Sequence, residues 1–280
     1  NIDWLINNSS KGFNGLCWGL NFEWPVTNNL IYNSNEPFTT HTPYALESID
    51  LFIKITGDNS YINYVKSIYN YYEKDVKPIV ETENLLAVSY GTSPDRIITN
   101  AISYTLYAYS IFSKYIKNNS IKVKRQKLFN FIESKQLNNG SWLYTPDSDD
   151  TFIDCFHTCF IIKNLIKSNK IEPIENANKL IIDGYNYLMD NFYDEDFGLF
   201  KRFSVSNKQS IIKFDLYDNA EVLNLFNLLE KRRDFNKLKN NIENNFINGT
   251  DVYSMIDIFN IKRNKNTLRW AVVPFLKAIN

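Results

Sequence analysis

The residues best suited to chemistry lie between positions 149 and 165, in the sequence DDTFIDCFHTCFIIKNL. Asp150, Asp154 and His157, one of two histidines in the chain, stand before or within the start of an apolar helix predicted over 151–165. Carboxylates and imidazoles are the side chains that most often act as general acids and bases. Because the helix that follows them is apolar enough to be buried, the sequence predicts that these polar side chains lie at the edge of a hydrophobic core.

Comparable polar residues open four other apolar segments. They are Thr40 and His41, Asp95 and Arg96, Asp215 and Asp218, and Arg269 and Trp270. Apolar and amphipathic helices alternate along the chain, and the predicted helices cover 45–55, 61–75, 97–112, 123–135, 151–165, 177–191, 216–229, 235–246 and 267–279. No run of alternating β-branched residues is long enough to predict a sheet, so we expect a nearly all-α protein.

About five such alternations predict two concentric layers of helices, that is, an all-α fold of the α/α-toroid type with an incomplete (α/α)5–6 barrel. In a toroid the inner helices point in one direction, so the residues at their N-termini gather at one mouth. The periodicity therefore predicts that the separate polar pairs form one pocket. We expect a single domain over residues 1–280, truncated at its N-terminus because the sequence does not begin with Met.

The predicted pocket has the chemistry of a site for an anionic carbohydrate. Helix N-termini together with Arg96 and Arg269 suit a carboxylate or phosphate. The carboxylates and the two histidines supply acids and bases. Flat aromatic faces match the C–H face of a pyranose ring, and the candidates for this stacking are Trp18, Trp24, Tyr90, Trp142 and Trp270.

Each candidate also has a purely structural interpretation. Asp150, Asp215 and Thr40 are residue types that cap helices, and His157 could be a hydrogen-bonded core histidine. Arg96 and Arg269 could form structural ion pairs, and aromatic residues on helices mostly belong to the core. The functional interpretation depends on the convergence of polar residues before apolar helices, and no single residue carries it.

The composition excludes several other classes of protein. The chain has 31 Lys and Arg residues and 31 Asp and Glu residues, so its formal net charge is zero. This balance argues against non-specific electrostatic binding of nucleic acid. No apolar run has membrane-spanning length and no signal peptide is evident, so we expect a cytoplasmic protein. Three cysteines match neither a disulfide framework nor a common zinc pattern, and we predict no cofactor and no metal. A divalent ion between Asp150, Asp154 and His157 is the alternative, although those three ligands alone make an incomplete site.

Several loop segments resemble, in order, those of bacterial capsule and exopolysaccharide biosynthesis proteins. The segments are 18–19, 41–45, 89–96, 136–142, 152–158, 214–215 and 268–270, and their most specific parts are Ser-Pro-Asp-Arg at 93–96 and Asp-x-Phe-His-Thr at 154–158. The resemblance implies an α/α toroid that is distantly similar to the C-terminal domain of glucuronyl C5-epimerases and to polysaccharide lyases. It implies a role in surface polysaccharide biosynthesis, with capsule-assembly proteins as partners. The chain departs from a complete toroid because the helix that would complete a sixth pair is missing.

These considerations leave three hypotheses open. The first is an epimerase or lyase that removes the proton α to the carboxylate of an acidic oligosaccharide or polysaccharide precursor, with Arg96 and Arg269 neutralising that carboxylate and His157 and Tyr90 as base and acid. The second is a glycoside hydrolase with a carboxylate pair, either Asp154 with Asp218 or Asp150 with Asp215. The third is a glycan-binding or scaffold module. The candidate catalytic residues are His157, Tyr90, Asp154, Arg96 and Asp218, and the candidate substrate-binding residues are Trp18, Trp24, His41, Asp95, Trp142, Asp150, Asp215, Arg269 and Trp270.

Overall fold

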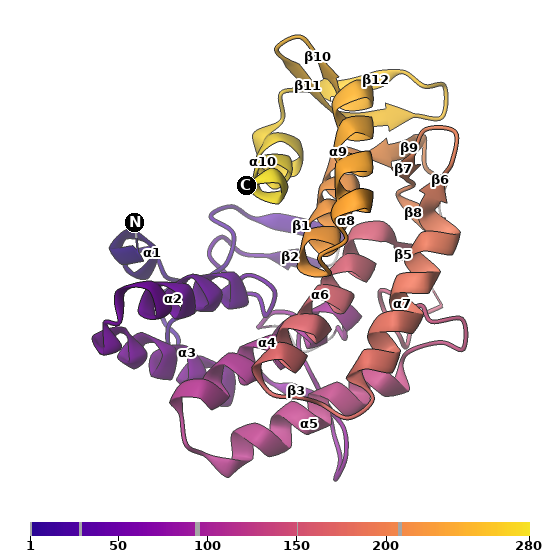
Figure 1. The fold of residues 1–280 in the computed structure, drawn as a ribbon. Coiled ribbons are helices and arrows are strands. Elements are labelled where there is room, and N and C mark those ends of the chain that lie inside the picture. The colour runs from indigo at the N-terminus through magenta and orange to yellow at the C-terminus, as the bar shows by residue number, and fades with distance from the viewer. Residues whose placement is uncertain (1, 28–29, 93–95, 150, 207–208) are drawn as a thin grey trace. The chain divides into compact units, whose positions relative to one another are not determined.

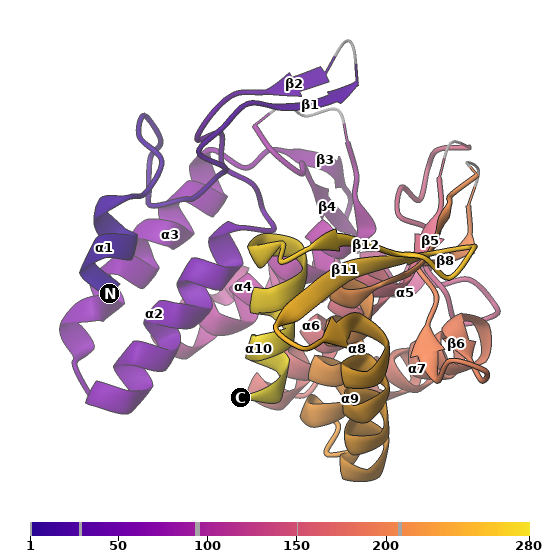
Figure 2. The same ribbon diagram turned by 90° about the horizontal axis from the view of Figure 1, so that it is seen from above.

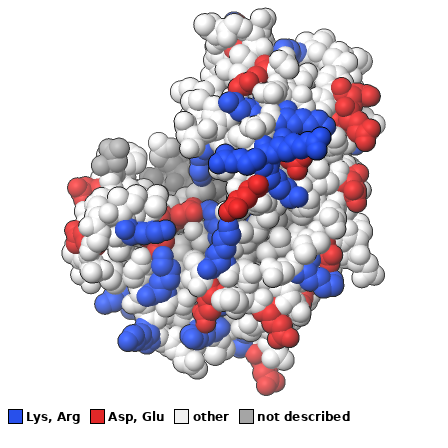
Figure 3. All heavy atoms as spheres, in the orientation of Figure 1, with Lys and Arg blue, Asp and Glu red and all other residues white. Residues whose placement is uncertain are grey.

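A computed structural model describes residues 2–27, 30–92, 96–149, 151–206 and 209–280. The chain forms two compact units. Unit 1 comprises Asn1–Lys135 and Asn164–Ala177, and unit 2 comprises Gln136–Lys163 and Asn178–Asn280. The single domain expected from the sequence remains a prediction. The basic side chains on the face in Figure 3 are interspersed with acidic ones, in keeping with the zero net charge.

Unit 1 is mainly helical (Figure 1). Its helices are α1 (Ile2–Asn7), α2 (Thr42–Thr56), the 3-10 turn η1 (Asn59–Tyr61), α3 (Ile62–Lys74), α4 (Thr99–Tyr115) and α5 (Asn119–Ser134). Two short antiparallel pairs join them, β1 (Trp24–Thr27) with β2 (Leu30–Tyr32) and β3 (Pro78–Glu81) with β4 (Leu86–Val88). Each of these helices after α1 overlaps a helix predicted from the sequence.

The core of unit 1 is organised around α4. Every residue of this helix from Thr99 to Phe112 is buried, as its nearly continuous apolarity predicts. The neighbouring helix α5 contributes a buried cation, because Arg125 is only 6% exposed. Its Nε donates to Ser110 Oγ of α4 at 2.9 Å and its Nη2 donates to the carbonyl of Ser168 at 3.1 Å. These bonds tie three helical segments of unit 1 together and satisfy the buried guanidinium.

Unit 2 contains the first part of α6 (Cys155–Ile171), most of α7 (Ala177–Phe192), α8 (Leu216–Leu228), α9 (Arg232–Phe246) and α10 (Val273–Ile279), which follows a π-helical segment η2 (Leu268–Val272). Its strands are β5 (Ile153–Asp154), β6 (Tyr193–Asp194), β7 (Leu199–Phe200), β8 (Phe203–Val205), β9 (Ile212–Asp215), β10 (Ile247–Asn248), β11 (Asp251–Asp257) and β12 (Lys262–Lys265). Helix α8 packs against α9 and α10.

The strands of unit 2 correct the prediction that the chain lacks sheet. β9, β10, β11 and β12 form an antiparallel four-stranded sheet in which β11 pairs with each of the others. The strand β9 runs directly into α8, and its last residue, Asp215, lies opposite Met255 of β11. This register places the ribbon of β11 and β12 beside the first turn of α8 (Figure 2).

The predicted start of the helix over 151–165 is also wrong by four residues. Ile153 and Asp154 form β5, which pairs with β8, and α6 begins only at Cys155. The β-branched Ile153 suits an extended backbone, and pairing with β8 outweighs continuation of the helix. Of the helices in the described part of the chain, none combines the length and the apolarity needed to cross a membrane.

Candidate functional site

Asp154 and His157 form a hydrogen-bonded pair at the junction of β5 and α6. Nδ1 of His157 lies 2.8 Å from each carboxylate oxygen of Asp154, whose Oδ1 also accepts the backbone N–H of His157 at 3.3 Å. Asp154 thus caps α6 and orients the ring. An ionised carboxylate only accepts hydrogen bonds, so Nδ1 carries a proton, and in the neutral ring Nε2 has the free lone pair.

Four aromatic rings of unit 2 surround the imidazole of His157. Its centroid is 3.9 Å from the ring of Phe156, 4.5 Å from that of Tyr144, 6.1 Å from that of Phe160 and 6.2 Å from that of Phe152. Tyr144 and Phe152 are themselves stacked at 4.5 Å. The side chain of His157 remains 19% exposed while that of Asp154 is 3% exposed. The histidine is therefore held in one orientation by apolar contacts while part of its ring can reach a ligand.

Asp218, in the first turn of α8, is a buried carboxyl group that contacts the start of α6. Its Oδ1 accepts the backbone N–H of Phe156 at 3.0 Å, whereas its Oδ2 has no hydrogen-bond partner among the described residues. Burial, and secondarily the nearby carboxylates of Asp215 and Asp154, raise the pKa of Asp218 well above its usual range. This shift favours the neutral carboxylic acid over the carboxylate.

Asp215 is the N-cap of α8 and the partner of an arginine. Its Oδ1 accepts the N–H of Tyr217 at 2.9 Å and its Oδ2 accepts Nη1 of Arg202 at 2.6 Å. Burial raises the pKa of Asp215, and the hydrogen bonds from Tyr217 and Arg202 oppose that rise. The structural interpretation of Asp215 as a cap is therefore correct, although the same carboxylate also binds Arg202.

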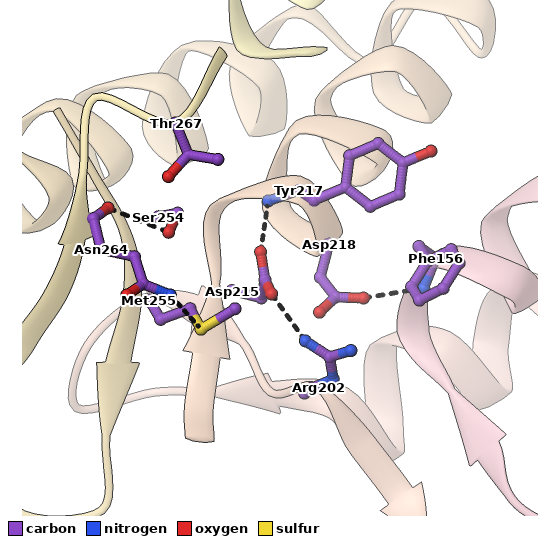
Figure 4. A pocket seen from close by; sticks show the side chains of 9 residues that line it. All are labelled: Phe156, Arg202, Asp215, Tyr217, Asp218, Ser254, Met255, Asn264 and Thr267. Carbon is purple, nitrogen blue, oxygen red and sulfur yellow. Dashed lines mark hydrogen bonds and ion pairs between the residues drawn. The ribbon is translucent and has the colours of Figure 1, made fainter. Parts of the chain in front are cut away.

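A cavity of about 310 Å³ lies where the first turn of α8 meets β11 and β12 (Figure 4). Its lining residues are Phe156, Arg202, Asp215, Tyr217, Asp218, Ser254, Met255, Asn264 and Thr267. This volume is at the lower end of the range of about 300–1,000 Å³ for small-molecule sites. His157 does not line the cavity, but the ring of Phe156 contacts both the cavity and the imidazole. Unit 2 therefore brings together the predicted residues from 154–157 and 215–218.

The predicted site residues of unit 1 lie around an aromatic cluster. The ring of Trp24 is 5.8 Å from that of Phe38 and 6.3 Å from that of Tyr90. Burial raises the pKa of Tyr90 to about 12. Nδ1 of His41 lies 3.3 Å from Oγ1 of Thr40. Whether this cluster shares a site with the residues of unit 2 remains a prediction.

Arg96 also belongs to unit 1, where its backbone carbonyl accepts the N–H of Tyr90 at 3.3 Å. Its side chain is half-buried. The role predicted for Arg96, to neutralise a ligand carboxylate, is therefore untested.

Two of the predicted stacking residues are core residues. Trp142 is 2% exposed, and a Cβ atom at Gly184 of α7 would lie only 2.6 Å from its Cζ3, so the glycine provides the space for the indole. Trp18 is 8% exposed, and its indole N–H donates to the carbonyl of Leu5 at 2.9 Å. Both indoles are thus buried in this structure, and the sugar-binding role expected of them from the sequence stays a prediction.

The remaining predicted residues are Arg269, which is exposed in η2, and Asp95, Asp150 and the side chain of Trp270, which lie outside the described part of the chain. The alternative metal site with Asp150 is therefore untested. Within the described residues, no three His, Cys, Asp or Glu side chains are grouped so that they could hold a metal ion. Cys155 and Cys159 are buried free thiols, and burial raises the pKa of Cys155 well above its ordinary value.

The sequence analysis missed most of the cavity lining. Phe156 and Tyr217 could have been predicted from the sequence, because each is an aromatic residue between two polar residues that had already been selected as candidates. Those pairs are Asp154 with His157, and Asp215 with Asp218. Arg202 had none, since it reaches Asp215 through the pairing of segments near β7 and β9, where its N–H donates to the carbonyl of Lys213 at 3.1 Å. Ser254, Met255 and Asn264 were missed because no sheet was predicted.

The helical architecture of the chain is that of the α/α-toroid fold, as the sequence predicted. No family model matches the sequence, and no curated protein does either. The structure is similar to cellobiose 2-epimerase from Bacillus thermoamylovorans (TM-score 0.73, 10% identity, 93% of this chain and 73% of that one). It is also similar to a sugar epimerase from a ruminal bacterium (TM-score 0.70, 12% identity, 99% of this chain and 78% of that one).

A third similar structure is the GH76 α-mannanase of Bacteroides thetaiotaomicron (TM-score 0.63, 10% identity, 90% of this chain and 72% of that one). All three structural neighbours are carbohydrate-active enzymes, two of them sugar epimerases and one a glycoside hydrolase. At this level of identity the similarity establishes the fold alone. None of the three is a capsule biosynthesis protein or a glucuronyl C5-epimerase.

Proposed function

We propose that this protein is a carbohydrate-active enzyme that moves a proton at a sugar carbon next to a carbonyl or carboxylate group, with epimerase chemistry first and lyase chemistry second. The observation that carries the proposal is the Asp154–His157 pair, in which both distances from Nδ1 are 2.8 Å. A carboxylate on Nδ1 leaves Nε2 as the base and stabilises the imidazolium that forms when it takes a proton. Asp154 is then a positioning residue and His157 the catalytic one.

In the proposed reaction, Nε2 of His157 removes the proton, and the electron pair of the C–H bond moves toward the adjacent carbonyl or carboxylate. Return of a proton to the opposite face of that carbon gives the epimer. In a lyase the C–O bond at the neighbouring carbon breaks instead, and the departing oxygen takes the proton held by the imidazolium, which gives an unsaturated sugar and a free hydroxyl group. Return to the opposite face requires a second acid, and Tyr90, the residue that the sequence suggested for this role, stays a prediction.

The two sugar epimerases among the structural neighbours support a sugar as substrate. Surface polysaccharide biosynthesis in a bacterial cytoplasm is part of the same proposal, as are an acidic oligosaccharide substrate and capsule-assembly partners. This setting is supported by the resemblance of segments 89–96 and 152–158 to capsule proteins, and the acidic substrate by Arg96 and Arg269.

A second candidate function is glycoside hydrolysis by Asp215 and Asp218. Burial raises the pKa of Asp218 well above its usual range, Asp215 binds Arg202, and both line one cavity. A carboxyl group that favours its neutral form, beside one that is paired with a cation, is an arrangement suited to the acid and the base of glycosidic cleavage. The α-mannanase among the neighbours is consistent with this candidate.

The test of the proposal is hydrogen exchange in deuterated water with a panel of neutral and uronic oligosaccharides. An epimerase exchanges the proton at the reacting carbon and produces a second diastereomer, whereas a lyase produces an unsaturated product that absorbs short-wavelength ultraviolet light. Release of a reducing sugar without exchange favours the hydrolase. Binding without any of these reactions overturns both candidates and leaves a glycan-binding module.

A further inference from the structure

The cavity beside the first turn of α8 contains a polar atom that no described residue satisfies. Asp218 is 0% exposed, and although its Oδ1 accepts the N–H of Phe156, its Oδ2 is buried without a partner. Buried carboxyl oxygens are nearly always hydrogen-bonded, because an unmet bond inside a protein is costly. Figure 4 shows this carboxyl group beside the other lining residues. A ligand hydroxyl group would satisfy it.

The charges of the described lining residues are already matched. Arg202 is the cation among them, and its Nη1 lies 2.6 Å from Oδ2 of Asp215. Burial raises the pKa of Asp218 well above its usual range, which favours the uncharged form. The other polar lining residues, Ser254, Asn264, Thr267 and the phenol of Tyr217, are uncharged near neutral pH. A ligand carboxylate or phosphate here would face the charge of Asp215 without a spare cation.

The wall of the cavity also offers flat apolar surface. The rings of Phe156 and Tyr217 both line it, and their centroids are 5.2 Å apart at an interplanar angle of 58°. The C–H face of a pyranose packs against such rings while its hydroxyl groups bind polar atoms at the edge. Few polar groups and an aromatic wall are the usual composition of a small-ligand site.

We infer that this cavity is a subsite for one uncharged sugar residue, with Oδ2 of Asp218 hydrogen-bonded to a ring hydroxyl group and an aromatic ring of Phe156 or Tyr217 against the sugar. The inference rests on the proposed function only in taking the ligand to be a carbohydrate. It assigns this cavity to an uncharged residue even if the ligand carries a carboxylate elsewhere.

Titration calorimetry with matched pairs of disaccharides tests the subsite. The probes are cellobiose, β-1,4-mannobiose and lactose, each beside the same disaccharide with both residues oxidised at C6 to uronic acids, so that whichever residue enters the cavity carries a carboxylate. We expect at least one neutral disaccharide to bind the wild-type protein. Its uronic counterpart should bind at least about tenfold more weakly. Saturation by none of the neutral probes, or tighter binding of the uronic forms, overturns the inference.

Two substitutions at Asp218 locate the binding. Asn can accept from the N–H of Phe156 through Oδ1 and offer a hydrogen bond through Nδ2, so Asp218→Asn should retain the affinity within about threefold. Asp218→Leu removes both polar atoms of the side chain. It should weaken binding about tenfold, because one hydrogen bond to the ligand is lost. Thr267→Val, of nearly the same shape, tests the cavity should the Leu variant fail to fold, and it too should weaken binding. Unchanged affinity in Asp218→Leu, or in Thr267→Val where the former does not fold, contradicts the inference.

The His157→Ala variant separates this inference from the proposed function. His157 does not line the cavity, so the variant should bind the neutral disaccharide with nearly wild-type affinity while exchange is lost. Retained exchange in His157→Ala together with weakened binding in Asp218→Leu refutes the proposed base and leaves the subsite intact. Loss of exchange in His157→Ala with wild-type binding in Asp218→Leu refutes the subsite alone.

Discussion

Nδ1 of His157 lies 2.8 Å from both carboxylate oxygens of Asp154, which also caps the helix that carries the histidine. The cap and the orienting group are thus one side chain, three residues before the base. This arrangement fixes the tautomer of His157 by local structure, without a partner from elsewhere in the chain.

Replacing Asp154 by Asn should therefore reverse the tautomer while keeping the cap. The amide oxygen can still accept the N–H of His157, but the amide NH2 donates to Nδ1 and drives the proton to Nε2. We expect kcat for the proposed proton transfer to fall about 10²–10⁴-fold with little change in KM. Nitrogen-15 NMR of the histidine should show Nε2 protonated.

The control for this variant is Thr158→Val. The hydroxyl group of Thr158 donates to the carbonyl of Asp154 at 2.7 Å, so its loss perturbs the same turn without touching the ring. In Thr158→Val, His157 should have the same tautomer as in the wild type. An Asp154→Asn variant with wild-type kcat and an unprotonated Nε2 would show that the pair does not position a base.

The raised pKa of Asp218 predicts the pH dependence of stability. The folded protein holds the proton of Asp218 over a pH range in which the unfolded chain has released it, so stability is lost as the pH rises from about 4 through the raised pKa. This carboxyl group contributes at most about 1.4 kcal/mol per pH unit. Relative to the wild type, Asp218→Asn should gain stability with rising pH, as urea denaturation at several pH values can measure. If the difference in unfolding free energy between this variant and the wild type does not vary with pH, Asp218 is ionised in the folded protein.

Replacing Arg202 by Gln should destabilise the protein because Asp215 stays buried without its cation. The side chain of Asp215 is 6% exposed and that of Arg202 28% exposed, so we expect a loss of about 1–3 kcal/mol in the free energy of unfolding. The double variant Arg202→Gln with Asp215→Asn should recover part of this loss, since Asn also caps helices. Urea denaturation measures both. No recovery in the double variant would show that the arginine acts by packing rather than by charge.

The contact between Gly184 and Trp142 predicts a substitution whose effect changes sign. Gly184→Ala adds a methyl group 2.6 Å from Cζ3 of the indole, and overpacking costs about 1–3 kcal/mol against a gain in helix propensity of about 1 kcal/mol. The variant should thus be less stable than the wild type. In a Trp142→Phe background the clash is absent, so the same change should stabilise the protein. Thermal denaturation of the four proteins gives the comparison, and equal effects in both backgrounds would exclude this contact.

The helices were predictable because their apolar periodicity is local. Helix α4 shows this best, since its nearly continuous apolarity corresponds to burial of every residue from Thr99 to Phe112. The start of α6 was not predictable, because the extended conformation of Ile153 depends on pairing with Val205, about fifty residues later. Local propensity cannot include such a partner.

The acidic and imidazole groups of the site were likewise visible at the starts of α6 and α8, but their partners were not. Arg202 reaches Asp215 only because strand pairing brings the two segments together. Ser254 and Asn264 line the cavity from a sheet whose register sets them beside α8. The burial of Trp142 was not predictable, because a tryptophan after a turn has the same local signal whether it stacks on a ligand or fills the space above a glycine.

The central claim is that His157 removes a proton from a sugar carbon. The most direct measurement is the rate of deuterium incorporation at that carbon, by NMR in deuterated water, for the wild type and His157→Ala with and without added imidazole. The account predicts exchange in the wild type, loss of about 10²–10⁴-fold in the variant and partial recovery when imidazole occupies the vacated space. Exchange in His157→Ala at the wild-type rate would contradict it.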